Sequence, residues 1–329
     1  MTTTVKTRLS VDEYVQGIVE KDTITLSRAI TLIESGRKDD LHLSEQVLSA
    51  ILPYTGQSKR IGITGVPGVG KSTFIESLGL FLADKGHKLA VLAIDPSSQR
   101  TGGSILGDKT RMDNLSKHPN AYIRPSATGS SLGGVANKTR EALLLCEAAG
   151  FDVIFIETVG VGQSETAVKG MVDFFLLLML AGAGDELQGI KKGIMEMADA
   201  VVINKADGDN ITPAKLAKAE YQNALHLFPP TASGWIPQVK LCSALKSSGI
   251  AEVWEMMESY FTQLGGEGVD EQRKSQNLNW MHESIGHLLK TTFYRSPLVE
   301  KEIPVLEDDI RSGKITPFAA ARRLIELAY

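Results

Sequence analysis

The fold of this chain is decided by residues 65–73, which read Gly65-Val66-Pro67-Gly68-Val69-Gly70-Lys71-Ser72-Thr73. An apolar run at 61–64 precedes them and residues 74–78 follow with helical spacing, so the G-x-x-x-x-G-K-[ST] pattern stands between a strand and a helix. Glycines let backbone N–H groups approach phosphate oxygens, Lys71 adds charge at the β- and γ-phosphates, and the Ser72 hydroxyl suits Mg²⁺. A glycine-rich turn that binds nothing is the alternative. The flanking context favours a nucleotide-binding loop made of all nine residues.

Composition excludes several classes of protein. The 329 residues are 43% hydrophobic and 22% charged, which predicts a sizeable core. A net charge of −4 and a pI near 5.9 argue against a nucleic-acid partner. Cys146 and Cys242 each lie in apolar sequence, which favours buried thiols over a disulfide or a metal site. With no signal-like start and no apolar run near 20 residues, we expect a soluble, cytoplasmic protein without a membrane partner.

The middle of the chain, residues 59–264, alternates strand-like and helical patterns. Near-continuous apolar strands separated by helices predict an α/β P-loop NTPase with a mostly parallel sheet covered by helices. The expected strands are Ile61–Thr64, Leu89–Ile94, Val153–Ile156, Phe174–Leu180, Ala200–Ile203 and Val239–Cys242. The expected helices are Thr73–Asp84, Val135–Ala149 with Gly150 as its C-cap, Pro213–Leu227 and Ile250–Leu264.

Helical segments flank this domain on both sides. Residues 1–58 predict a helical N-terminal extension, with Ser44 as a cap and Pro53 as a stop; packing on the next domain is favoured over a partner-binding hairpin. After a glycine-rich linker at 265–268, residues 270–329 return to helical spacing, so a helical C-terminal arm is expected over residues 265–329. This C-terminal arm has too little apolar surface to fold alone, so it must dock on the nucleotide domain, on a second copy or on a partner.

Acidic residues near the ends of two strands are candidates for a metal site. Asp95 ends the strand at 89–94 and could hold Mg²⁺ directly or through water, or could cap a turn before Pro96. In the glycine-rich stretch 101–112, Asp108 is a candidate metal ligand and Arg111 a phosphate or interface contact, although a solvated turn explains both equally well.

A second acidic motif follows the strand at 153–156. Glu157 closes this strand on the metal side, and the N–H of Gly160 would meet the γ-phosphate. Gln163 could orient water, but it stands several residues later than in Ras-like proteins, and we do not name it catalytic.

The sequence Asn204-Lys205-Ala206-Asp207 predicts the choice of base. The Asp207 carboxylate can accept from guanine N1–H and the exocyclic amine, the Lys205 stem covers the base, and Asn204 braces the loop. Adenine would leave the carboxylate unpaired. A backbone amide in Ser243-Ala244-Leu245 can meet guanine O6. GTP is therefore favoured over ATP.

With these motifs, the strings at 102–112 and 187–193 make the chain resemble the MeaB/ArgK-type GTPases, whose human relative is MMAA. These are G-protein chaperones of adenosylcobalamin-dependent methylmalonyl-CoA mutase, and the similarity extends over nearly the whole chain. The resemblance implies a GTPase that gates cofactor delivery to the mutase and protects it, and a homodimer joined through the C-terminal arm. Direct contact with a cobalamin adenosyltransferase stays open.

The resemblance also implies roles for single residues. Ser72, Asp95, Asp108 and Glu157 would form the Mg²⁺ shell, and Lys71, Asp108 and Glu157 the catalytic centre. The switch residues would be Arg111, Gln163, Gln188 and Lys191, the last two in an additional switch at 182–193 that reports the nucleotide state.

The expected reaction is hydrolysis of GTP to GDP and phosphate, with Lys71 and Mg²⁺ neutralising charge. No residue is an evident general base, which predicts slow intrinsic hydrolysis. A P-loop kinase that phosphorylates a protein or metabolite is the first alternative. A metal-delivery G protein is the second, although such proteins need Cys and His clusters that this sequence lacks.

Overall fold

The computed structural model describes residues 8–94, 112–125, 132–158, 164–182, 192–228 and 234–328. The chain forms two compact units, Met1–Lys274 and Ser275–Tyr329. No helix among the described residues is long and apolar enough to cross a membrane.

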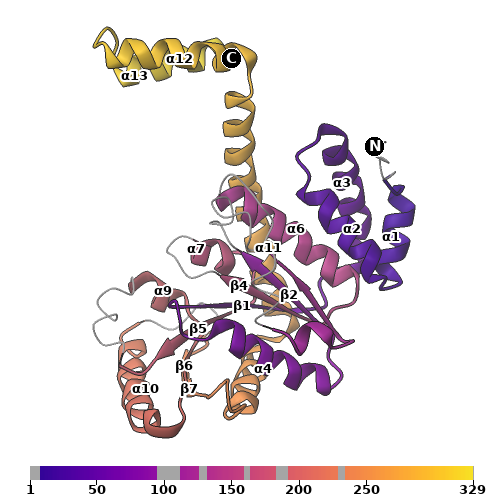
Figure 1. Ribbon diagram of the computed structural model, residues 1–329, viewed down its shortest axis with the longest axis vertical. Coiled ribbons are helices and arrows are strands. Elements are labelled where there is room, and N and C mark those ends of the chain that lie inside the picture. Colours follow the sequence, from indigo (N-terminus) through magenta and orange to yellow (C-terminus); the bar gives the residue numbers. More distant parts are fainter. Residues whose placement is uncertain are drawn as a thin grey trace. The chain divides into compact units, whose positions relative to one another are not determined.

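The first unit is built on a sheet of seven parallel strands in the order β3-β2-β4-β1-β5-β6-β7 (Figure 1). The strands are β1 (Lys59–Gly65), β2 (Leu89–Ile94), β3 (Ala121–Arg124), β4 (Val153–Thr158), β5 (Phe174–Leu180), β6 (Ala200–Asn204) and β7 (Gln238–Leu241). This confirms the predicted α/β P-loop fold. β3 is an addition, because a four-residue edge strand that is mostly half-buried has no clear alternation in sequence.

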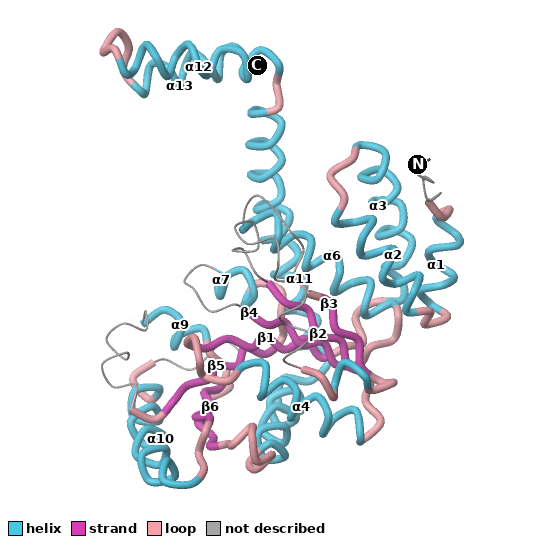
Figure 2. The backbone as a smooth tube through the Cα atoms, in the orientation of Figure 1, coloured by secondary structure: helices cyan, strands magenta, loops and turns pink. Residues whose placement is uncertain are grey.

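Helices make up most of the rest of the structure (Figure 2). The α-helices are α1 (Val11–Val19), α2 (Thr23–Glu34), α3 (Lys38–Ile51), α4 (Lys71–Asp84), α6 (Leu132–Ala148), α7 (Ser164–Lys169), α9 (Lys192–Met197), α10 (Ile211–Leu225), α11 (Ile250–Tyr294), α12 (Pro297–Arg311) and α13 (Pro317–Ala328). Short 3₁₀ turns lie at η1 (Leu52–Tyr54), η2 (Leu115–Lys117) and η3 (Gly208–Asn210).

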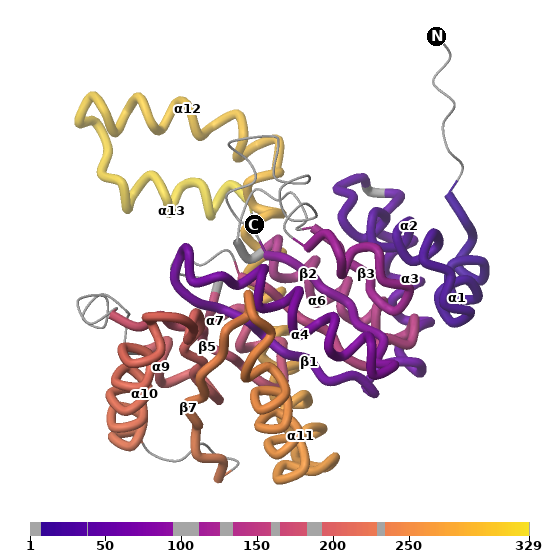
Figure 3. The backbone as a smooth tube through the Cα atoms, turned by 60° about the horizontal axis from the view of Figure 1, so that its bottom comes forward, coloured from indigo at the N-terminus to yellow at the C-terminus, as the bar shows by residue number. Residues whose placement is uncertain are grey.

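Hydrophobic cores lie on both faces of the sheet because strand side chains alternate with period two. In β4, Val153 and Phe155 pack with α4 and the first part of α11, whereas Ile154 and Ile156 pack with α6 and the N-terminal helices. The N-terminal helices lie towards one edge of the sheet and α10 towards the other (Figures 1 and 3). Every strand from β1 to β6 except β3 is almost wholly buried, as parallel sheets require.

The predicted C-cap of α6 is confirmed. Gly150 has φ +79°, its N–H bonds to the carbonyl of Glu147 at 2.9 Å, and the N–H of Phe151 bonds to Cys146 at 3.2 Å. These two bonds form a Schellman motif, which satisfies the last carbonyls of the helix and turns the chain into β4.

The N-terminal extension begins with a capping box in which Ser10 and Glu13 bond reciprocally. The predicted capping role of Ser44 is wrong. Ser44 lies inside α3, where its hydroxyl donates to the carbonyl of Leu41 at 2.7 Å, and α3 begins six residues earlier. Such back-bonding lets serine sit within a helix.

α11 spans the predicted linker at 265–268. Only Gly265 has non-helical backbone there, with φ +68° and ψ +170°, so the linker is a kink between two helical stretches. In the second unit, α12 and α13 pack through Val299, Leu306 and Ala320, with an ion pair of 2.7 Å between Arg323 and Glu302.

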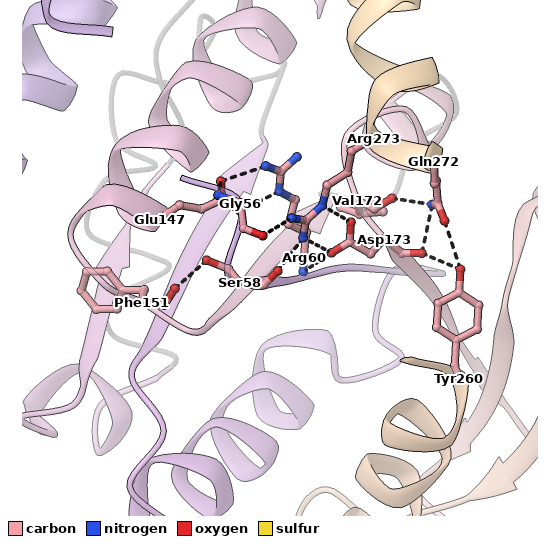
Figure 4. A network of polar contacts seen from close by, with 10 residues as sticks. All are labelled: Gly56, Ser58, Arg60, Glu147, Phe151, Val172, Asp173, Tyr260, Gln272 and Arg273. Carbon is pink, nitrogen blue, oxygen red and sulfur yellow. Dashed lines mark hydrogen bonds and ion pairs between the residues drawn. The ribbon is translucent and has the colours of Figure 1, made fainter. Parts of the chain in front are cut away.

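Buried charges gather where β1 and β5 begin, at the amino edge of the sheet (Figure 4). The Asp173 carboxylate accepts from the backbone N–H of Arg60 at 2.8 Å and from Arg273 Nε and Nη2 at 2.8 and 2.7 Å. Arg273 also donates to the carbonyl of Gly56 at 2.6 Å. The guanidinium of Arg60 pairs with both carboxylate oxygens of Glu147 at 2.8 Å. These bonds join the start of both strands to α6 and α11.

Candidate nucleotide-binding site

The register of the strands brings the predicted motifs to one edge. Gly65 at the end of β1 lies opposite Leu178 of β5, and Glu157 of β4 lies opposite Ile63 of β1. Asn204 ends β6 beside Leu180 of β5. The phosphate loop, the acidic motif and the base motif therefore all lie at the carboxyl edge, where ligands of open α/β sheets bind.

The phosphate loop turns from β1 into α4, which begins at Lys71. Gly70 precedes the helix with φ +92°, and a Cβ on it would lie 2.9 Å from Nδ2 of Asn204. Only glycine fits this conformation and this close approach. The helix N-terminus faces the loop and adds its unpaired N–H groups and dipole.

Lys71 folds back onto its own loop. Its ammonium donates to the carbonyl of Gly65 at 2.8 Å and lies 3.4 Å from the carbonyl of Val66. Burial lowers the pKa of Lys71, and the nearby carboxylates of Glu157 and Glu165 oppose that shift. The ammonium is thus a half-buried cation at the point where phosphates of a bound nucleotide would lie.

Ser72 and Glu157, both predicted to lie on the metal side of the site, are close together in the structure. The Ser72 hydroxyl donates to Oε1 of Glu157 at 3.3 Å, and Glu157 is only 7% exposed. Next to it, Thr158 Oγ1 bonds to Thr64 Oγ1 at 2.7 Å and ties β4 to β1. A hydroxyl beside a carboxylate is an oxygen donor set that suits Mg²⁺. In the described part of the chain, no three His, Cys, Asp or Glu side chains gather as metal ligands.

The base motif is tied to the phosphate loop by two bonds. Asn204 Nδ2 donates to the carbonyl of Val69 at 2.8 Å, and Lys205 Nζ donates to the carbonyl of Gly68 at 2.8 Å. On its other side Asn204 Oδ1 accepts from the backbone N–H of Ala244 at 3.1 Å. Asn204 therefore joins three loops, which is the bracing role that the sequence suggested.

Asp207 and the loop after β7 complete this side. The Ser243 hydroxyl donates to Oδ2 of Asp207, and the N–H of Ala206 bonds to the carbonyl of Cys242 at 2.9 Å. Leu245, in the same loop, has a side chain that is 76% exposed. The structure thus brings residues 204–207 and 243–244 together.

Seven predicted site residues lie outside the described residues: Asp95, Asp108, Arg111, Gly160, Gln163, Gln188 and Lys191. Two further contacts were not predicted. Cys242 Sγ lies 3.5 Å from Asn204 Oδ1, and Asn210 Nδ2 donates to the carbonyl of Lys205 at 2.7 Å. The available signals were the closeness of Asn210 to the base motif and the position of Cys242 directly before the predicted Ser243-Ala244-Leu245 segment.

A parallel sheet with a phosphate loop after β1 and an Asn-Lys-x-Asp loop after β6, tied to each other, defines the class of P-loop GTPases. Comparison with known proteins agrees and narrows the class. A family model described as "Methylmalonyl Co-A mutase-associated GTPase MeaB" matches residues 26–297, and the chain belongs to this family of GTPases. The family is linked by its description to methylmalonyl-CoA mutase.

Individual relatives cover nearly the whole chain. "Probable GTPase Rv1496" of Mycobacterium tuberculosis is 51% identical, over 97% of this chain and 95% of that protein. "Methylmalonic aciduria type A homolog, mitochondrial" of Mus musculus is 45% identical, over 96% of this chain and 79% of that protein. A solved structure described as "Crystal structure of LAO/AO transport system kinase" is 37% identical with a TM-score of 0.75, over 96% of both chains.

Proposed function

We propose that this GTPase gates the loading of adenosylcobalamin onto methylmalonyl-CoA mutase, or a related acyl-CoA mutase, and protects the mutase. The family description and the mouse relative's name support the choice of partner. The assignment of the GTP site rests on two hydrogen bonds of 2.8 Å, from the Asn204 and Lys205 side chains to carbonyls of the phosphate loop. Through them one rigid edge can hold both the base and the phosphates of GTP.

In the proposed mechanism Lys71 exchanges its bonds to loop carbonyls for bonds to the β- and γ-phosphate oxygens, where it stabilises charge during phosphoryl transfer to water. The Ser72 hydroxyl, with Glu157 beside it, would hold Mg²⁺, whose charge neutralises the same oxygens. Asp95 and Asp108 are proposed as further metal-side residues, and the Gly160 N–H as a contact of the γ-phosphate. Asp207 selects guanine.

No general base takes part in this mechanism, so hydrolysis by the isolated protein is slow. Binding of the mutase acts through the proposed switch residues Arg111, Gln163, Gln188 and Lys191 and speeds the reaction. The nucleotide state then acts as a timing signal for delivery of the cofactor.

We also propose that the arm forms a homodimer. In the second unit, Leu278, Met281, Ile285 and Leu288 of α11 are spaced by three and four residues, and each is 45–61% exposed. Such a row is typical of the contact stripe of a coiled coil. Replacing Met281 and Leu288 together by Glu should give a monomer by sedimentation; a dimer that survives both changes would rule out this stripe.

A pull-down tests the partner. With the mutase as bait, we expect different retention of this protein when it is loaded with GDP and with a non-hydrolysable GTP analogue, because the two states present different switch surfaces. Equal retention in both states, or none, would contradict the gating role. The same experiment with a cobalamin adenosyltransferase tests a second proposed contact.

The related protein of known structure is described as a kinase, which suggests transfer of the γ-phosphate to a protein or metabolite as a competing reaction. With γ-labelled GTP and the mutase present, we expect all label to appear as inorganic phosphate. Label that appears on a protein or metabolite would establish phosphotransfer instead.

A further inference from the structure

Asn210 lies at the N-cap position of α10 without capping it. An asparagine at this position usually accepts a hydrogen bond from a backbone N–H two or three residues later. Asn210 makes no such bond. Its Nδ2 points back along the chain and donates to the carbonyl of Lys205 at 2.7 Å.

The residue that Asn210 holds has an unusual backbone. Lys205 has φ +58°, in the left-handed region that a residue with a Cβ seldom adopts. From that backbone its side chain extends to the phosphate loop, where Nζ donates to the carbonyl of Gly68 at 2.8 Å. Asn210 makes a second hydrogen bond within the same loop, from its backbone N–H to the carbonyl of Asp207 at 3.0 Å.

We propose that Asn210 is a positioning residue for the guanine nucleotide. Through the Lys205 carbonyl it fixes the backbone from which the lysine stem extends over the face of the base. This inference rests on the proposed assignment of residues 204–207 to the base. The stem covers any purine ring, whereas Asp207 recognises the exocyclic amine, so Asn210 contributes equally to binding of guanine and hypoxanthine nucleotides.

The alternative is that Asn210 only stabilises the start of α10, and the variant Asn210→Asp distinguishes the two roles. In Asn210→Asp the carboxylate keeps the size of the side chain and interacts favourably with the dipole at the start of α10, but it cannot donate to the Lys205 carbonyl. If Asn210 positions Lys205, this variant keeps its thermal stability and loses nucleotide affinity. If Asn210 only supports the helix, it keeps both.

The test is calorimetric titration with GDP and with inosine diphosphate, in high salt to screen the added charge. Asn210→Ala and Asn210→Asp should each raise the Kd of both nucleotides by the same factor, about 2- to 10-fold for one lost hydrogen bond. The Tm without nucleotide should stay unchanged for Asn210→Asp. Asn223→Ala, an exposed asparagine near the other end of α10, is the matched control and should leave Kd unchanged.

Two further variants separate the possible failures. Suppose that Lys205→Ala weakens nucleotide binding. If the Asn210 variants leave both Kd values unchanged, or raise the Kd of GDP alone, the positioning role of Asn210 is wrong and the assignment of this loop to the base stands. If Lys205→Ala leaves both Kd values unchanged, the assignment of this loop to the base is itself wrong.

Discussion

The two ends of the central strands carry charge in different ways. At the amino edge, Asp173 and Glu147 are fully buried, and each pairs with an arginine through two hydrogen bonds. At the carboxyl edge, the ammonium of Lys71 donates to carbonyls of its own loop. Buried charges that compensate each other hold a structure together, whereas a cation on neutral carbonyls can change partners when an anion arrives. We infer that the amino edge supports stability and the carboxyl edge function.

The largest effect should come from breaking the amino edge. Arg273→Met leaves the Asp173 carboxylate buried without its cation, which should lower the free energy of unfolding by about 3–5 kcal/mol. Urea unfolding measures this, and GDP affinity of the folded variant should change little. Lys274→Met is the control, because the neighbouring Lys274 side chain is 71% exposed. An equal loss of stability in both variants would remove the special role of Arg273.

A substitution at the carboxyl edge should have the converse effect and lower activity without lowering stability. Lys71→Ala should lower the rate of GTP hydrolysis by about 10²–10³-fold, as loss of one stabilising donor does at other sites. Its free energy of unfolding should hardly fall, because removal of a half-buried cation also removes a desolvation cost. Phosphate release and urea unfolding give the two values. Lys85→Ala, just beyond the other end of α4, should leave turnover unchanged; unchanged turnover in Lys71→Ala would exclude the loop from the mechanism.

A smaller effect is expected from Asp207→Asn, which keeps the shape of the side chain but offers one acceptor where guanine needs two. The preference for GDP over inosine diphosphate should fall by about tenfold, or about 1.4 kcal/mol. Titration with both nucleotides measures the ratio. Asp209→Asn, two residues later and exposed, should keep the preference of the unchanged protein; a ratio unaffected by Asp207→Asn would mean that guanine is read elsewhere.

The smallest effect on stability is expected at the Arg8–Asp40 ion pair. Its carboxylate is buried like those at the amino edge, but its cation is more exposed. Asp40 accepts from Arg8 at 2.7 and 2.9 Å and from Ser35 at 2.6 Å, and these hydrogen bonds lower the pKa of Asp40 below its ordinary 3.8. A lowered carboxyl pKa gives stability that is present above pH 3.8 and is lost as the pH falls through the folded-state value.

Asp40→Asn should therefore cost about 1 kcal/mol at neutral pH, since the Arg8 side chain is partly exposed, and almost nothing in strong acid. Urea unfolding across pH measures the difference. Exposed Asp39→Asn serves as the control. A cost that is the same at every pH would show that the effect does not come from the charge.

The same contrast explains what the sequence could predict. The carboxyl edge is encoded in short continuous motifs, so the phosphate loop and residues 204–207 could be placed before the structure was known. Buried strands such as β5 were predicted because their residues are apolar throughout. The Arg273–Asp173 pair could not be predicted, because the two residues are 100 positions apart and no pattern links them. Ser44 was misplaced because a serine that caps a helix and one that bonds within it look the same in sequence.

The most direct test of the proposed gating role is the steady-state rate of phosphate release from GTP as methylmalonyl-CoA mutase is added. We predict a slow rate for the protein alone and a saturable increase with the mutase, which Lys71→Ala abolishes. A fast rate that does not respond to the mutase would contradict the gating role.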